Sequence, residues 1–396
     1  MPAPIATSRA DQERRHGLDS LRFLAILAVL FDHFVQLPAV QPGYVSTRFF
    51  LLLSGFLITR TLLRYEGPEP GRNRHLLRSF YGRRALRIWP LYYLILLGVL
   101  AAGLLPLRQF VVHAAFLTNI VQAWTNNWDL PWYLTHVWTL CVQEQFYLLW
   151  PAVMLPLGQR SRQWFLVALI GAAVLFRLLL WQLGMSDQVA FYTAPFASAD
   201  ALAAGSLLAI VHGAAAARLD RPAATIVALF GGCLLLHFVG RAAASTVLLP
   251  TLWLAPLGFL TLAVFDGRLG SAGAWLEWPP LAFLGRISLG IYLLHLPLWL
   301  LFFKLAPDWL QRLVPAPSWA AFLLLAPATI ATAAVSWWLF EQPLQRFRRY
   351  LPYPARAVGP GSGPAQAQRE GTRDVLRPAV GEDQVPASAG NGHHQP

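Results

Sequence analysis

Charged residues are scarce in this chain, and cysteine is almost missing. Only 13% of the 396 residues are charged and 56% are hydrophobic, whereas soluble domains carry about 25% charged residues. The composition therefore excludes an ordinary soluble domain and indicates a membrane protein. The two cysteines, Cys141 and Cys233, lie in apolar segments, and they form neither a disulfide framework nor a metal-binding pattern. We expect no metal site.

Lysine is nearly missing as well, because Lys304 is the only lysine among 31 basic residues. The formal net charge of +12 would suit a nucleic-acid-binding protein, but basic residues of membrane proteins collect in cytoplasmic loops. The distribution of charge between loops, described below, favours the second explanation. We therefore expect membrane lipid, and no nucleic acid, as a partner.

Long apolar segments recur over most of the chain and predict an all-α, polytopic membrane helix bundle. A helix needs about 20 predominantly apolar residues to cross the hydrocarbon core. The shortest of the segments is the sixth, which contains Asp200. Ten segments are candidate spans: 18–37, 45–64, 86–105, 133–156, 164–184, 196–213, 222–240, 246–265, 281–303 and 318–341.

Basic residues divide unevenly between the connections on the two sides of these spans. With a cytoplasmic N-terminus, the cytoplasmic segments up to Arg356 hold 17 basic residues and the outside loops hold 4. The positive-inside rule therefore places both termini in the cytoplasm. We divide the chain into a cytoplasmic segment 1–17, a membrane domain 18–345 and a tail 355–396, whose Pro-, Gly- and Ala-rich sequence predicts disorder.

The first span, LDSLRFLAILAVLFDHFVQL, contains ionisable residues that a simple anchor would not need. Arg22 and His33 are eleven residues apart, so on a helix they project from nearly one face, about 16 Å apart along the axis. Ionisable groups inside a membrane are costly and are functional by default. We interpret His33 as an acid–base or acyl-handling residue and keep Asp19 as a further candidate. The structural alternative is that Arg22 reaches the interface and His33 only hydrogen-bonds within the bundle.

A basic segment, RSFYGRRALRIWPLYY, follows the second span. Arg84 and Arg87 are three residues apart, so on a helix they share a face and can bind one anion together. Guanidinium groups suit phosphate oxygens, and coenzyme A carries a pyrophosphate and a 3′-phosphate. The alternative, which we weigh about equally, is that this segment sets topology or touches anionic lipid.

The segment HVWTLCVQEQFYLLWP, residues 136–151, places Glu144 near the middle of the membrane and Tyr147 close to it. A buried carboxylate must be paired or neutral, so Glu144 needs a cationic partner. Its candidate partners are Arg22, His33 and Arg177.

Two later segments add further candidates. LGRISLGIYLLHLPLW, residues 284–299, offers Tyr292 and His295 to the bundle interior, and a polar packing seam is at least as good an explanation as direct catalysis. Glu341 ends the last span, and we expect it to pair with cytoplasmic arginines. Asp200 is an isolated carboxylate for which the sequence names no partner.

Taken in order, these motifs resemble those of the acyltransferase-3 family of polytopic membrane acyltransferases, which includes bacterial O-acetylases of lipopolysaccharide, exopolysaccharide, Nod factors and macrolides. The resemblance covers about residues 17–345. It places the family's Arg-x10-His pair on Arg22 and His33, its Arg-x-x-Arg pair on Arg84 and Arg87, and its signature glutamate on Glu144. The matching segments are GLDSLRFLAILAVLFDHF, FFLLLSGFLITRTL, RRALRIWPLYYL, VWTLCVQEQFYLLWP, LGRISLGIYLLHLPL and FEQPL.

The chain departs from the family's pattern at two positions. The signature commonly has two adjacent acids, and here the first is Gln143; an arginine often stands two residues before Asp200, and here that residue is Ser198. Some members also carry a C-terminal periplasmic domain. The tail here resembles no such domain, so we expect the membrane domain to act alone or with a separate partner.

The resemblance implies a multi-pass O-acyltransferase of the bacterial inner membrane. Acyl-CoA, in the family's habit acetyl-CoA, would be the donor substrate, no cofactor would be bound tightly, and the acceptor would be a hydroxyl of a carbohydrate or a small molecule. Arg84 and Arg87, with Arg22 nearby, would hold the phosphates of the donor. His33 would deprotonate the acceptor or carry the acyl group, and Glu144 would orient His33.

The main alternative is a transporter or flippase for a glycan or a lipid-linked intermediate. Such a protein would also have many spans and buried charges, but it would not need arginines at the cytoplasmic end of a helix adjoining His33. A non-catalytic partner in polysaccharide synthesis is a second alternative. The loop 106–132, with Trp124, Asn126 and Asp129, has the chemistry of sugar contact. The sequence names neither the acceptor nor the oligomeric state.

Overall fold

The computed structural model describes residues 9–36, 41–128, 130–186, 188–217, 221–240, 244–315 and 317–354. These residues form helices and no strand, which confirms the expected all-α class. The tail 355–396 and Asp129 lie outside the described residues.

Ten helices account for most of the described chain. They are α1 (Arg9–Val35), α2 (Pro42–Tyr65), α3 (Arg72–Ala101), α6 (Trp138–Met154), α7 (Gln159–Gln182), α9 (Pro195–Ala217), α10 (Pro222–Val239), α12 (Leu254–Phe265), α14 (Ser288–Leu305) and α16 (Trp319–Ser336). Shorter helices join them: α4 (Leu107–Ala114), α5 (Thr118–Thr125), α8 (Ala190–Thr193), α11 (Leu249–Leu252), α13 (Pro279–Arg286), α15 (Asp308–Leu313) and α17 (Gln342–Gln345). The remaining turns are η1 (Trp132–Val137), η2 (Ala244–Leu248), η3 (Gly270–Glu277), η4 (Trp337–Glu341) and η5 (Arg346–Tyr350).

Eight helical segments of the described chain are long and apolar enough to cross a membrane, and each overlaps one of the ten expected spans. The two expected spans without such a counterpart are helical too. α1 contains Asp19, Arg22 and Asp32 within its apolar part, and α6 has 17 residues, just below the usual length. The polytopic membrane class is therefore supported, while the count of ten spans stays a prediction.

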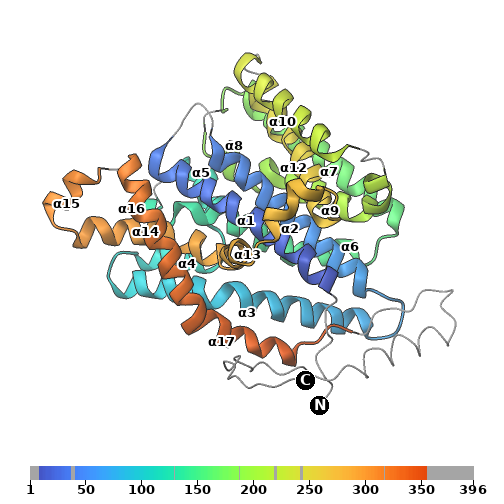
Figure 1. Cartoon of the computed structure of the whole chain (residues 1–396), viewed down its shortest axis with the longest axis horizontal. Helices are drawn as coiled ribbons and strands as arrows, with labels where there is room; N and C mark the ends of the chain where they lie inside the picture. The colour runs from blue at the N-terminus through green and yellow to red at the C-terminus, as the bar shows by residue number, and fades with distance from the viewer. Residues whose placement is uncertain are drawn as a thin grey trace, which may run out of the picture. The chain divides into compact units, whose positions relative to one another are not determined.

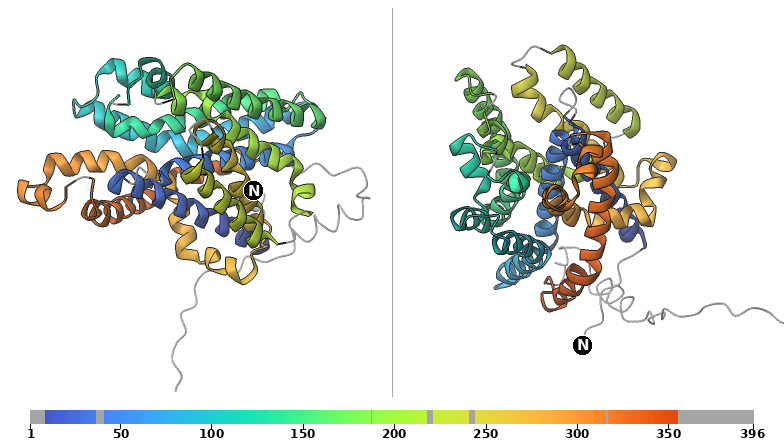
Figure 2. Two further views of the ribbon diagram at one scale, coloured as in Figure 1. Left: turned by 90° about the horizontal axis from the view of Figure 1, so that it is seen from above. Right: turned by 90° about the vertical axis from the view of Figure 1, so that its left-hand side faces the viewer.

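Helices α1 and α2 form the centre of the described bundle. α2 packs against α1 on one side and against α9 on the other, and both views of Figure 2 place the blue α1 and α2 between green and orange helices. The crossing of α2 and α9 depends on Gly55 and Gly205. A Cβ atom on Gly205 would lie 1.8 Å from the carbonyl oxygen of Leu52, so only glycine permits this close approach.

The ninth expected span, 281–303, is a broken helix. α13 ends at Arg286 and α14 begins at Ser288. α13 packs closely on α1 (Figure 1), where a Cβ atom on Gly285 would lie 1.7 Å from the carbonyl oxygen of Asp19. Gly285 thus permits the close approach of α13 to α1, and the break brings the N-terminus of α14 into the bundle.

The loop 106–132 is largely helical where it is described. It contains α4 and α5 and leads into η1. His113 is buried here: one ring nitrogen bonds the hydroxyl of Thr118 at 2.7 Å and the other bonds the carbonyl of Leu130 at 2.8 Å. Burial lowers the pKa of His113 to about 4, so the folded loop holds this imidazole in its neutral form.

Asp200 is the centre of a buried ion cluster that the sequence did not reveal. Arg48 of α2 and Arg177 of α7 both pair with its carboxylate, and Thr251 donates a hydrogen bond to it at 2.6 Å. All three charged side chains are at most 1% exposed. Arg48 and Arg177 hold the carboxylate from elements other than α9, so Asp200 does not depend on a cation at Ser198. The cluster ties α2, α7, α9 and α11 together.

Candidate active site

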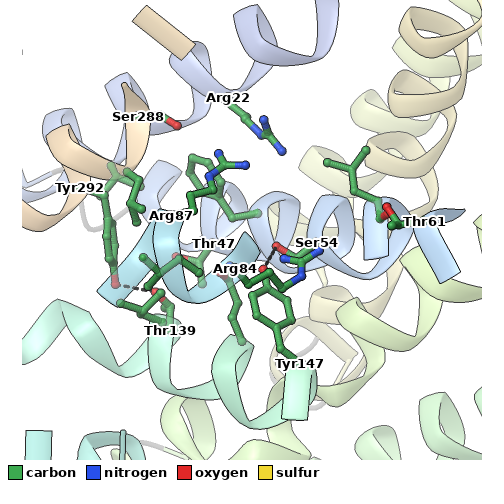
Figure 3. Close-up of a pocket in the computed structure, with 17 residues that line it drawn as sticks. Arg22, Thr47, Ser54, Thr61, Arg84, Arg87, Thr139, Tyr147, Ser288 and Tyr292 are labelled. Carbon is green, nitrogen blue, oxygen red and sulfur yellow. Dashed lines mark hydrogen bonds between the residues drawn. The ribbon is translucent and has the colours of Figure 1, made fainter. Parts of the chain in front are cut away.

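A cavity of about 300 Å³ lies between α1, α2, α3, α6 and α14. Arg22, Arg84 and Arg87 all line it (Figure 3). Around them the wall carries hydroxyl groups and apolar side chains, namely Val29, Thr47, Phe50, Ser54, Leu57, Thr61, Ile88, Thr139, Leu140, Gln143, Tyr147, Ser288, Leu289 and Tyr292. Three guanidinium groups around one small cavity are suited to an anionic ligand. We call this the arginine cavity.

Neighbouring side chains hold two of these arginines in place. Arg22 bonds Asp19 at 2.7 Å, one turn earlier on α1. The guanidinium of Arg84 lies 4.2 Å from the ring centroid of Tyr147, a cation–π contact. Tyr147 in turn donates a hydrogen bond to Ser54 at 3.2 Å (Figure 3). The fixed positions of these guanidinium groups reduce the entropy that a bound anion would cost.

The helix register explains why only some of the basic residues of α3 reach the cavity. Arg84 and Arg87 are three apart and share a face, as the sequence predicts. Arg83 is turned away and donates hydrogen bonds to the carbonyls of Arg348 and Leu351 at 3.1 and 3.0 Å. The segment is the N-terminal part of helix α3 and not a loop.

The N-terminus of α14 adds a further positive element. Ser288 and Leu289, its first two residues, line the arginine cavity, and the start of a helix carries partial positive charge. Glu341 lies close to this helix start: its carboxylate would be 3.2 Å from a Cβ on Gly290, and the charge of Arg87 acts on it. Among the described residues Glu341 forms no direct ion pair with an arginine; Ser336 donates a hydrogen bond to its carboxylate at 3.3 Å, and Arg87 acts on it only through its charge.

A second cavity, of about 430 Å³, contains His33. We call it the histidine cavity. His136 and Tyr292 line it as well, together with Val29, Asp32, Gln36, Gln41, Gly43, Tyr44, Thr47, Trp128, Thr135, Trp138, Thr139 and Tyr192. His295, which is fully buried, lies directly behind His33. The side chain of His136 packs against the rings of Tyr292 and His295.

The hydrogen bonds of His295 fix the proton positions on His33. Nδ1 of His295 lies 2.6 Å from the carbonyl oxygen of Tyr292, and a carbonyl only accepts, so this nitrogen carries the proton. Nε2 of a neutral His295 is then an acceptor. It lies 3.1 Å from Nδ1 of His33, which must be the donor. Nε2 of neutral His33 therefore keeps its lone pair for chemistry.

The two cavities share a wall. Val29, Thr47, Thr139 and Tyr292 line both of them. The hydroxyl of Tyr292 bonds Thr139 at 2.6 Å (Figure 3). It also donates to the carbonyl of His136. The α1 residues 22, 29 and 33 follow one another along a single helix face, so the predicted stripe of Arg22 and His33 runs from the first cavity into the second.

Glu144 is not brought to His33. Within the described part of the chain, its carboxylate accepts a hydrogen bond from Trp89 at 3.2 Å and is acted on by the charge of Arg84. The reason is the rotation of α6: Gln143 and Tyr147, four apart, face the arginine cavity, and residue 144 is turned about 100° away. The predicted contact between Glu144 and His33 is therefore absent. Of the two other proposed partners, Arg22 pairs with Asp19 and Arg177 with Asp200.

The sequence-predicted residues thus fall into three groups. Around the two cavities the structure gathers Asp19, Arg22, His33, Arg84, Arg87, Tyr147, Tyr292, His295 and Glu341. Glu144 does not line either cavity and bonds Trp89 instead. Asp200 belongs to the separate buried ion cluster with Arg48. Sequence reasoning missed Arg48, although a cation inside the second span was a usable signal. It also missed His136 and Thr139, which no periodicity distinguished from packing residues.

Comparison with known proteins gives a match over most of the chain. A family model described as an acyltransferase domain matches residues 15–341. Among individual proteins, the peptidoglycan O-acetyltransferase OatA of Listeria monocytogenes is 25% identical over 325 residues, which are 74% of this chain and 50% of that protein.

Two shorter matches concern the same kind of protein. A putative O-acetyltransferase of Staphylococcus aureus is 29% identical over 156 residues, 36% of this chain and 25% of that protein. The putative peptidoglycan O-acetyltransferase YrhL of Bacillus subtilis is 29% identical over 154 residues, 34% of this chain and 23% of that protein. The chain thus spans about half, or less, of the length of these relatives. No solved structure matches the chain.

Proposed function

Because the chain belongs to the acyltransferase-3 family of polytopic membrane proteins, we propose that it transfers an acyl group, in the simplest case acetyl, from cytoplasmic acyl-CoA to a hydroxyl of a cell-wall glycan. The observation that carries this proposal is the pair of cavities with a common wall, one lined by three arginines and the other by His33. A donor with anionic phosphates at one end and a neutral acyl group at the other matches a cationic cavity beside the cavity that contains His33.

The donor enters from the arginine side. Its phosphates bind Arg84, Arg87 and Arg22, and the start of α14 adds its dipole. The cavity itself, at about 300 Å³, has the size of a small ligand site, so the pantetheine arm occupies it while the nucleotide stays at its mouth. The hydroxyls of Thr47, Ser54 and Thr61 line the path of the arm.

The thioester reaches the common wall of the two cavities, where His33 acts through Nε2. As a base, His33 takes the proton of the acceptor hydroxyl while the acceptor oxygen bonds to the acyl carbon. The carbon–sulfur bond then breaks, and the proton passes to the leaving thiolate to give free CoA. As an acyl carrier, Nε2 of His33 would attack the same carbon and the carbon–sulfur bond would break, so that CoA leaves as the thiolate. The acceptor oxygen would then take the acyl group from the imidazole, and its proton would pass to the thiolate. In either route His295 holds the ring and shares the positive charge that develops on it.

The acceptor comes from the histidine side. Two of the relatives carry peptidoglycan O-acetyltransferase in their names, which supports a glycan of the cell wall. The predicted topology supports the same direction, because arginine-rich helix ends lie in the cytoplasm and His33 lies about 16 Å further along α1. Glu144 acts here on Arg84 and Trp89, and not on His33.

The test uses the full chain in nanodiscs, supplied with acetyl-CoA and the tetramer of N-acetylglucosamine. We expect free CoA to appear only when the acceptor is present, together with an acetylated tetramer seen by mass spectrometry. His33→Ala abolishes both. Release of CoA that does not depend on His33, or transport of the glycan without any release, would show a different function.

A pair of charge-matched variants tests the arginine cavity. Arg87 lines the cavity, whereas Arg78, on the same helix, is exposed. A hydrogen bond to a charged group contributes about 1.5–3 kcal/mol, so Arg87→Gln weakens acetyl-CoA binding about 10- to 100-fold. Arg78→Gln removes the same charge from the surface and leaves binding within about twofold. Equal effects of the two variants would mean that only the net charge of the face matters.

A further inference from the structure

A third cavity, of about 230 Å³, adjoins the histidine cavity and takes no part in the reaction described above. Gln41, Tyr44 and Tyr192 line both cavities, so the two spaces adjoin at these residues. From there the third cavity extends between α8, α10, η2 and α11, where it is lined by Val45, Phe191, Leu234, His237, Ser245, Thr246, Leu249, Pro250 and Trp253. We call it the aromatic cavity.

Its lining combines aromatic faces with uncharged polar groups. Tyr44 and Tyr192 stand edge to face, with ring centroids 5.7 Å apart, and Trp128 of the histidine cavity lies 6.1 Å from Tyr192. The C–H groups of a pyranose ring carry partial positive charge and pack on the negative face of an aromatic ring. Amide and hydroxyl side chains such as Gln41 and Thr246 match its hydroxyl and acetamido groups.

The lack of charged side chains in the lining also favours a sugar as the ligand of the aromatic cavity. Among the described residues that line the aromatic cavity there is no Asp, Glu, Lys or Arg. The arginine cavity, which lies on the other side of the histidine cavity, contains three arginines. An anionic ligand therefore has its site at one end, and the aromatic cavity suits an uncharged one.

The backbone at the junction is strained. Gln41 has a φ of 46° and begins α2 without a side-chain capping bond, and Gln36 of the histidine cavity has a φ of 58°. Residues other than glycine rarely adopt such angles, and their strain is typical of ligand sites. Gln41 thus presents an amide at the border of the two cavities, and Gln36 presents one within the histidine cavity.

We propose that the aromatic cavity is a second sugar subsite, so that the acceptor is an uncharged glycan of at least two pyranose units. This inference rests on the proposed function. The first ring presents its hydroxyl to His33 in the histidine cavity, and the next ring lies in the aromatic cavity beyond Tyr44 and Tyr192. A single sugar reaches the first subsite only.

The test compares the monomer and the tetramer of N-acetylglucosamine. In titration calorimetry without acyl-CoA, the wild-type chain in nanodiscs binds the tetramer about tenfold more tightly than the monomer, because one more ring is stacked. In turnover with acetyl-CoA, kcat/KM shows the same ratio. Equal binding of the two sugars would overturn the proposal.

Two variants fill the aromatic cavity from opposite walls. Thr246→Phe, on η2, and Leu234→Trp, on α10, are both expected to reduce the tetramer-to-monomer affinity ratio to about one. The control is Val239→Phe, which adds the same ring to α10 at a position that is 73% exposed, and it keeps the ratio. If both filling variants keep the ratio, the second ring binds elsewhere and the proposal is wrong.

The binding measurement allows the second sugar subsite and the proposed acyl transfer to be tested separately. If the tetramer binds through the aromatic cavity but no CoA is released, the acyl transfer is wrong and the glycan subsite stands. If CoA release depends on His33 while the monomer and the tetramer bind and react equally, the acyl transfer stands and the second subsite is wrong.

Discussion

Replacing His295 tests the assignment of the reactive nitrogen of His33. In the protein, Nδ1–H of His33 donates to Nε2 of His295 at 3.1 Å, which leaves Nε2 of His33 free. His295→Phe keeps an aromatic ring in the fully buried site but removes the acceptor. Without the imidazole acceptor, the tautomer of His33 with the proton on Nδ1 is less favoured, and the tautomer with the proton on Nε2, which blocks the reaction, gains population.

The size of the effect follows from the lost hydrogen bond. Between two neutral groups such a bond contributes about 1 kcal/mol, and between a charged and a neutral group about 1.5–3 kcal/mol. The bond becomes charged when His33 takes up the proton, so the loss is larger in the transition state than in the resting enzyme. Only this difference, about 0.5–2 kcal/mol, adds to the barrier of the bound complex, so we expect kcat to fall about 2- to 30-fold. The KM for acetyl-CoA stays constant, because His295 does not line the arginine cavity.

The assay is CoA release by the variant in nanodiscs at several acetyl-CoA concentrations. His295→Gln, which can still accept a hydrogen bond, recovers part of the lost kcat. The control is His212→Phe, the same substitution at a histidine that is bonded to Asp266 away from the two cavities. A His295→Phe variant with full kcat, or one in which only KM changes, would refute the assignment of the His33 tautomer.

Three further predictions concern stability, measured as the thermal unfolding of the purified chain. Asp200→Asn leaves two buried arginines uncompensated and destabilises the chain by about 3–5 kcal/mol. Gly205→Ala lowers the unfolding temperature strongly because the new Cβ would overlap a carbonyl oxygen of α2, whereas Gly231→Ala, with open space around it, does not. His113 is held neutral with its pKa lowered from 6.5 to about 4, so its contribution is complete above pH 6.5 and is lost as the pH falls towards 4; in His113→Gln the unfolding temperature falls less steeply over that window.

The sequence predicted those parts of the site that depend on one helix at a time. Arg22 and His33 on α1, and Arg84 and Arg87 on α3, lie on the faces that the helical period assigns to them. The hydropathy pattern also placed eight of the ten expected spans. These properties are local, because residue spacing and side-chain polarity determine them.

The sequence did not predict contacts that depend on the rotation or pairing of separate helices. Glu144 was expected to contact His33. Helix α6 is rotated so that Gln143 and Tyr147 face the arginine cavity, and in this orientation Glu144 contacts Trp89. Asp200 was left without a partner, since Arg48 and Arg177 come from two other helices. The break between α13 and α14 was missed for a similar reason, because it is set by packing on α1 and not by a proline at the break.

The common wall of Val29, Thr47, Thr139 and Tyr292 has an electrical consequence for the cell. Moving one elementary charge across the membrane involves about 2.3 kcal/mol per 100 mV. In the proposed reaction the charged CoA stays with the arginines, the acyl group passes the wall towards the acceptor, and the proton of the acceptor hydroxyl passes the other way to the thiolate. Thioester and hydroxyl thus exchange an acyl group for a proton, and no net charge crosses. The three guanidinium groups also repel cations at the inner end. The reaction therefore neither draws on the membrane potential nor discharges it, and its rate should be the same in energised and de-energised vesicles.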